Sequence, residues 1–131
     1  MKVLDSDTCI GILRGRIDVI ERRAVEPDEV ATTWVTASEL FYGAAKSARP
    51  DANAALVVRF LNTLPVIAPD LGSARLFGEV KARLATAGQI VADADLFIAS
   101  IALSRGASLV TGNRKHYGRI PGLVLEDWLW P

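Results

Sequence analysis

The stretch KVLD at Lys2–Asp5 is a short apolar run that ends on an acid, and SDTCIGIL at Ser6–Leu13 follows it directly. The run has the length and apolarity of a buried strand, and the next segment predicts a helix that stops near Gly15. An unpaired carboxylate buried at the end of a strand costs several kcal/mol, and a bound cation would remove that cost. Asp5 is therefore the first residue for which we expect a chemical role.

The rest of the chain alternates short apolar runs with longer helical patterns. Further strands are predicted at Val30–Val35, Pro65–Ala68, Ser108–Thr111 and Leu123–Trp128. Further helices are predicted at Ile17–Arg23, Thr36–Ala48, Asp51–Leu64, Asp70–Ala87 and Ala94–Arg105. The order β-α-α-β-α-α-β-α-α-β-β predicts an α/β fold, with a mostly parallel central sheet flanked by helices. No repeat or linker divides the chain, so residues 1–131 are expected to form a single domain.

The composition excludes several classes of protein. Half of the residues are hydrophobic, which excludes a disordered chain. One cysteine, Cys9, excludes an internal disulfide framework and a cysteine-based zinc site, and one histidine, His116, excludes a histidine-rich metal cage. Metal chemistry therefore falls to carboxylate oxygens, which favour Mg²⁺ or Mn²⁺.

Charge and hydropathy predict the compartment. Fifteen basic and fifteen acidic side chains balance, so bulk charge does not indicate a strongly basic nucleic-acid or membrane-surface binder. The N-terminus meets an acid at once and has no apolar signal core. The longest apolar stretch, 96–103, is far shorter than the ~20 residues of a membrane helix. We expect a cytoplasmic protein that does not bind membranes.

Acids gather next to the predicted strand ends and helix starts, where ligands bind in parallel sheets. Each acid also has a structural interpretation: Asp7 as an N-cap, Thr36 and Glu39 as a capping box, Asp93 and Asp95 as caps of their helix. If Asp5, Glu39 and Asp95 converge instead, their charges repel unless a divalent cation joins them. Such a site suits cleavage of a phosphodiester, because the metal acidifies water and stabilises charge on the phosphate.

Four segments in order resemble the motifs of PIN-domain ribonucleases, specifically the VapC-type toxins of type II toxin–antitoxin systems. They are Leu4-Asp5-Ser6-Asp7, Ser38-Glu39-Leu40-Phe41-Tyr42-Gly43-Ala44, Asp93-Ala94-Asp95-Leu96-Phe97-Ile98-Ala99, and a closing block of Leu109–Asn113, Ile120–Leu123 and Glu126–Trp128. The resemblance covers nearly the whole chain, and it implies a PIN-like three-layer sandwich.

The resemblance also implies an activity, which is metal-dependent endonucleolytic cleavage of RNA with a carboxylate-bound Mg²⁺ or Mn²⁺. Asp5, Glu39 and Asp95 are implied as the catalytic and metal-binding acids. Supporting roles are implied for Ser6, Asp93, Thr111 and Asn113. Many relatives carry a further acid in the region of Asn113 and His116, so a second metal is not implied here.

Partners follow from the same resemblance. Arg114 and Lys115 come directly after the predicted site and are the preferred RNA-binding residues, although an ordinary solvated loop explains them equally well. The resemblance implies a homodimer and a VapB-like antitoxin that covers the acidic pocket. Leu13 and the apolar residues of 17–23 are expected to contribute to the antitoxin groove.

Two alternatives stay open. A receiver-like signalling module is also an α/β domain with acids and Mg²⁺, but Val66–Pro69 ends without an acid until Asp70 and no lysine follows Leu123–Leu125. Uptake of acetyl phosphate at one aspartate would favour it. A catalytically silent PIN-fold binding protein is the second alternative. The presence of Asp5, Glu39 and Asp95 argues against a silent binding protein. The lack of a further acid in the region of Asn113 and His116 argues for it.

Overall fold

The computed structural model describes residues 1–131 and contains five strands and seven helices. The strands are β1 (Lys2–Leu4), β2 (Val30–Thr33), β3 (Val66–Ile67), β4 (Ser108–Val110) and β5 (Leu125–Glu126). The helices are α1 (Ser6–Leu13), α2 (Ile17–Ala24), α3 (Trp34–Ala45), α4 (Pro50–Leu61), α5 (Leu71–Thr86), α6 (Asp93–Ser104) and α7 (Arg114–Tyr117). Every predicted element is present, and α7 is an additional one.

All five strands form one parallel sheet in the order β3-β2-β1-β4-β5. The chain runs from β1 to β2 and β3 on one side, then crosses to β4 and β5 on the other. The order therefore reverses between β1 and β4, and ligands bind outside the carboxyl ends of strands at such a point. The Asp5 N–H donates to the Val110 carbonyl at 2.9 Å, so Asp5 lies at this position.

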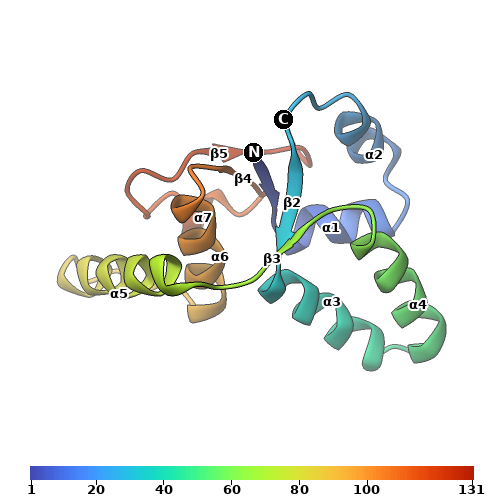
Figure 1. Cartoon of the computed structure of the whole chain (residues 1–131), viewed down its shortest axis with the longest axis horizontal. Coiled ribbons are helices and arrows are strands. Elements are labelled where there is room, and N and C mark those ends of the chain that lie inside the picture. The colour runs from blue at the N-terminus through green and yellow to red at the C-terminus, as the bar shows by residue number, and fades with distance from the viewer.

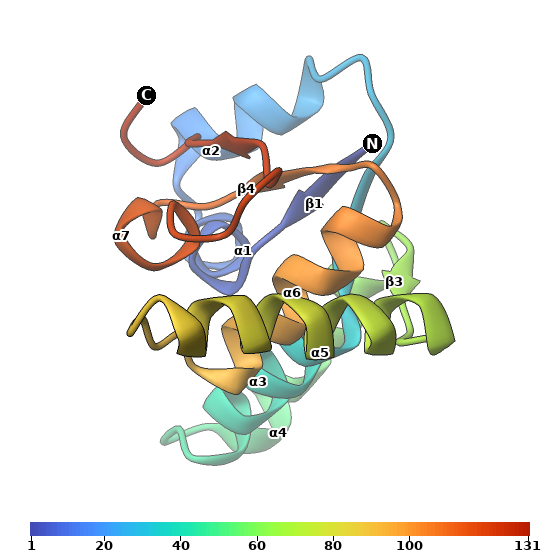
Figure 2. The ribbon, with the colours of Figure 1, turned by 90° about the vertical axis from the view of Figure 1, so that its left-hand side faces the viewer.

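Helices cover both faces of the sheet, as Figure 1 shows. Successive residues of a strand point to opposite faces. Val3 and Leu109 accordingly pack in a core with α5 and α6, whereas Leu4 and Val110 pack in a second core with α1, α3 and α4. The predicted three-layer α/β sandwich is confirmed, with an all-parallel sheet. Figure 2 shows α5 lying across α6 on one of these faces.

The start of α3 differs from the prediction. The helix begins at Trp34, and the Thr33 side chain caps it by accepting the Thr36 N–H at 3.2 Å. Trp34 is therefore not a core residue of a strand, and its side chain is partly exposed. The Thr36–Glu39 capping box does not form, which leaves Glu39 free for another role.

The C-terminal strand is shorter than predicted. β5 holds two residues, and the chain then turns so that Trp128 packs in the second core while Trp130 stays exposed. The Arg22 guanidinium lies 4.8 Å from the Trp128 ring centroid, which joins the tail to α2. None of the seven helices combines the length and the apolar composition that a membrane span requires.

Candidate active site

Asp5 lies at the end of β1 and caps α1. Its side chain is buried, with Oδ1 accepting the Ser6 N–H at 2.8 Å and Oδ2 accepting the Thr111 hydroxyl at 2.7 Å. Burial, together with the charges of Asp7 and Asp95, raises the pKa of Asp5 to about 6 against the effect of these two hydrogen bonds. No lysine or arginine pairs with Asp5, so this carboxylate has no basic counter-charge within 4 Å.

Asp95 lies in the first turn of α6 and faces Asp5 across one hydroxyl group. The Tyr117 Oη is 3.3 Å from Asp5 Oδ1 and 3.3 Å from Asp95 Oδ1. The fold thus brings together two acids that are 90 residues apart in the chain. Asp95 is not the N-cap of its helix, because Ala92 occupies that position without a side-chain cap.

Glu39 joins this group through Ser6. The Ser6 hydroxyl donates to Glu39 Oε1 at 3.0 Å and lies 3.1 Å from the Thr36 hydroxyl, and the Ser6 N–H binds Asp5. Glu39 is exposed and turned towards Ser6. No three acidic, histidine or cysteine side chains are arranged to hold a metal ion. The three predicted acids are therefore linked by Ser6 and Tyr117 rather than clustered around one point.

The contacts around the two acids also include Thr111, Asn113 and His116. The Thr111 hydroxyl, besides binding Asp5, accepts the Asn113 N–H at 3.0 Å. The Asn113 Nδ2 lies 3.2 Å from His116 Nδ1, which is 3.7 Å from Asp95 Oδ2. Asn113 thus contacts the site through Thr111 and His116, consistent with a supporting position.

Asp93 and the two predicted RNA-binding residues are not part of this set of contacts. The Asp93 carboxylate is exposed and forms an ion pair with Lys81 of α5 at 2.9 Å, so it does not join the two central acids. Arg114 and Lys115 are exposed on α7, a helical turn where the sequence indicated a loop. Neither forms an ion pair or a side-chain hydrogen bond within the chain.

Two residues of the site were missed from the sequence. Tyr117 fell in a segment without a predicted element, and no spacing rule connects it to residues 5 and 95. Asp7 was interpreted as an N-cap, but Asp5 caps α1. The Asp7 Oδ2 instead accepts the Gly112 N–H at 2.9 Å and so fixes the loop after β4. The acid-rich Asp5–Asp7 segment was the only available signal for Asp7.

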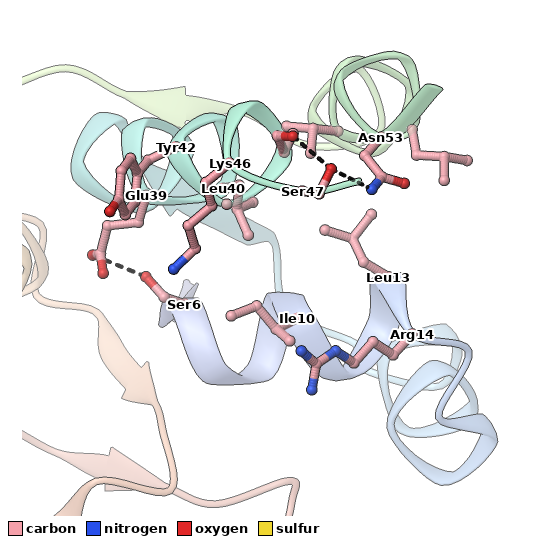
Figure 3. Close-up of a pocket in the computed structure, with 14 residues that line it drawn as sticks. Ser6, Ile10, Leu13, Arg14, Glu39, Leu40, Tyr42, Lys46, Ser47 and Asn53 are labelled. Atoms are coloured by element: carbon pink, nitrogen blue, oxygen red, sulfur yellow. Dashed lines mark hydrogen bonds between the residues drawn. The ribbon is translucent and has the colours of Figure 1, made fainter. Parts of the chain in front are cut away.

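A groove of about 600 Å³ begins at Ser6 and Glu39 and continues away from the acids between α1, α3 and α4 (Figure 3). Ile10, Leu13 and Leu56 give it apolar walls. Its charged lining consists of Arg14, Glu39 and Lys46. Leu13, one of the residues expected to contribute to an antitoxin groove, lines this groove, whereas no residue of α2 does.

The acidic site offers what a hard cation prefers. Its donors are carboxylate and hydroxyl oxygens. Burial, and to a lesser extent the neighbouring acids, raises the pKa of Asp5, so a divalent cation would relieve a charge that the chain leaves uncompensated. These features define an α/β protein with an acidic site at the switch point of a parallel sheet. The PIN domain family model matches residues 2–122, and the chain belongs to this family.

Known proteins resemble the chain over almost its full length. It is 38% identical over 127 residues to a tRNA(fMet)-specific endonuclease VapC of Salmonella typhimurium, with 96% of each chain covered. The crystal structure of DNA-bound VapBC from Salmonella typhimurium matches with a TM-score of 0.92 at 37% identity, covering 97% of both chains. A member of the VapBC family of toxin–antitoxin systems from Mycobacterium tuberculosis matches with a TM-score of 0.69 at 28% identity, covering 96% of this chain and 95% of that one.

Proposed function

We propose that the protein is a metal-dependent endoribonuclease and the toxin of a toxin–antitoxin pair. The observation that carries the proposal is that Asp5 and Asp95 meet around one hydroxyl, without a lysine or arginine partner, at the switch point of a PIN-domain sheet. Uncompensated acids at this place suit cation binding, and the relatives named as endonucleases support cleavage of RNA.

Asp5 and Asp95 would hold Mg²⁺ or Mn²⁺, with Glu39 next to them. A divalent cation bound there would lower the pKa of water and stabilise charge on the phosphodiester. Thr111 and Ser6 fix the Asp5 carboxylate by hydrogen bonds. Glu39 is exposed and keeps one carboxylate oxygen free of hydrogen bonds, and in this proposal it would orient the attacking water.

RNA is the proposed substrate, cleaved by hydrolysis of a phosphodiester bond. Arg114 and Lys115 supply exposed positive charge on the short helix that ends at Tyr117. Phosphate contacts dominate nucleic-acid affinity, so these two side chains would hold the RNA backbone next to the acids. Because the Salmonella relative is specific for tRNA(fMet), the initiator tRNA is the first substrate to test.

A VapB-like antitoxin is the proposed partner, supported by the VapBC structures that match this chain. The groove between α1, α3 and α4 has apolar walls and opens at Ser6 and Glu39. A segment laid in it would reach the acidic site and block RNA. A homodimer remains a prediction from the resemblance.

The experiment compares RNA cleavage by purified protein with Mg²⁺ or Mn²⁺ and with chelator. Asp5→Asn and Asp95→Asn are expected to lower cleavage at least about 100-fold, because each removes a charged group from the site. Asp28→Asn, an exposed loop acid outside the site, serves as the matched control and should keep wild-type activity. Equal cleavage by the site variants and the control would assign the activity to a contaminant.

The two alternatives give other outcomes in the same assays. Tight RNA binding without cleavage in any metal would favour the silent PIN-fold binding protein. The receiver-like interpretation is disfavoured, because Asp70 after β3 caps α5 and exchanges two hydrogen bonds with Ser73. Incorporation of phosphate from acetyl phosphate would restore it.

A further inference from the structure

Tyr117 ends α7, and its side chain is fully buried. Its hydroxyl is the only group within hydrogen-bond distance of both carboxylates, at 3.3 Å from Asp5 Oδ1 and from Asp95 Oδ1. We propose that Tyr117 is a positioning residue whose hydroxyl holds these two carboxylates in the orientation that binds a divalent cation. The proposal rests on the metal-dependent function argued above, and it adds a residue that acts through the two acids.

The ring and the hydroxyl of Tyr117 have separable roles. The ring packs in the first core, in the cluster that contains Val3, Leu109 and Ile120. A phenylalanine would fill the same space, so packing alone does not require the hydroxyl. A polar atom carried into a core costs free energy unless it is hydrogen-bonded, and here both of its partners are acids of the site.

The hydroxyl is shared between the acids. It has one proton and donates to one carboxylate at a time. Both distances exceed the 2.7–2.8 Å that is usual for an O–H···O bond, so neither acid holds the hydroxyl exclusively. Burial and the charges of Asp5 and Asp95 raise the pKa of Tyr117 far above its usual value, so the group remains a donor.

Asp95 depends on Tyr117 more than Asp5 does. Asp5 also accepts hydrogen bonds from Ser6 and Thr111, which hold it from two sides. Asp95 has no other side-chain hydrogen bond, and its remaining contact is His116 at 3.7 Å. The Asp95 side chain is also 26% exposed. Loss of the hydroxyl therefore releases mainly Asp95.

The test is Mn²⁺ binding by Tyr117→Phe, measured as free Mn²⁺ by electron paramagnetic resonance. Removing a group that orients a metal ligand weakens metal binding about 10-fold or more, and that is the expected result. Tyr42→Phe is the matched control, because Tyr42 is exposed and makes no hydrogen bond to an acid. Its Mn²⁺ affinity should stay within about twofold of the wild type. Unchanged affinity in Tyr117→Phe, or no Mn²⁺ binding by the wild type, would overturn the proposal.

A double variant separates positioning from a general structural defect. Because the hydroxyl acts mainly through Asp95, adding Tyr117→Phe to Asp95→Ala should weaken Mn²⁺ binding little further. A full additional loss would mean that the ring substitution damages the fold, and would refute the role. RNA cleavage by Tyr117→Phe should recover at saturating Mn²⁺. A wild type that binds Mn²⁺ but cuts no RNA would refute the proposed function while the binding results still decide the role of Tyr117.

Discussion

Asp5 combines two properties that a single residue rarely carries together. It caps α1 through the Ser6 N–H, and it is also a buried acid that faces another acid. The capping hydrogen bond favours the carboxylate, whereas burial favours the neutral acid, and burial has the larger effect on its pKa. The charged carboxylate of Asp5 is therefore expected to destabilise the metal-free protein at neutral pH.

The variant Asp5→Asn is accordingly expected to stabilise the metal-free protein. The folded pKa of Asp5 is about 6, above the usual value near 3.8, so the wild type loses stability as pH rises from about 4 to 6. A shift of this size corresponds to about 3 kcal/mol at pH 7. Thermal unfolding in chelator should show Asp5→Asn melting above the wild type at pH 7 and close to it at pH 4. A variant that is less stable at both pH values would contradict the argument.

At the scale of elements, β5 is held both by pairing with β4 and by the ion pairs of Glu126. It has two residues, yet its Glu126 accepts hydrogen bonds from Lys2, Arg22 and the Trp128 indole. These contacts connect β1, α2 and the tail around one carboxylate. Partial burial works against its charge, but the hydrogen bonds from Lys2 and Trp128 keep its pKa below the usual value. A short edge strand is thereby fixed next to β4, which carries Thr111 at its end.

The pH dependence of this carboxylate is expected to be opposite to that of Asp5. Because the folded pKa of Glu126 is depressed, its stabilisation is present above about pH 4.5 and is lost as pH falls through the folded value. Glu126→Gln should cost about 1 kcal/mol at pH 7 and less at pH 3. Thermal melts at both pH values measure this difference. Glu79→Gln removes an exposed ion pair with Arg75 and should change little at either pH.

The helix α7 is the element that determines the site. It has four residues, too few for a periodic pattern, and its exposed Arg114 and Lys115 give no apolar stripe. Its position follows from Tyr117, which is anchored in the core. One turn of helix thus carries the candidate RNA-binding charges on its outer side and the hydroxyl between the acids on its inner side.

At the scale of the whole molecule, the acidic site and the groove belong to different layers. Asp5 lies at the carboxyl end of the central strand β1, with Asp95 facing it. The groove lies among α1, α3 and α4, and Ser6 and Glu39 connect it to the acids (Figure 3). A partner seated in the groove would reach the acids from one side, and RNA held by α7 would reach them from another. Inhibition and cleavage are therefore expected to be separable by substitution.

Leu56→Asp tests this separation. Leu56 lines the groove on α4 and is partly exposed, so an acid there should weaken inhibition by the VapB-like antitoxin about 10-fold. Cleavage by the free protein should stay near the wild-type rate. Leu71→Asp places the same charge on an exposed leucine outside the groove, and its inhibition should not change. Equal inhibition of both variants would place the antitoxin elsewhere.

The pattern of the chain was sufficient to predict the elements and the class of fold. The alternation of short apolar runs and helical stretches predicts a parallel sheet, because burial on both faces requires apolar strands. Errors arose where local rules compete. Thr33 and Thr36 are both acceptable caps for α3. In the structure Thr33 is the cap, so the helix starts at Trp34 and Glu39 forms no capping box.

By itself, the sequence determined that an acid, Asp5, follows the first strand, and that further acids lie near the starts of α3 and α6. It also determined that any metal ligands among them are oxygen atoms. Tertiary structure decided which acids meet. Asp5 and Asp95 face each other because β1 lies centrally in the sheet and α6 packs on its face, whereas Asp93, two residues away, turns to Lys81. The hydroxyl between the two acids comes from Tyr117, more than 20 residues from either. Contacts between distant segments depend on the packing of whole elements, and no local pattern in the chain records them.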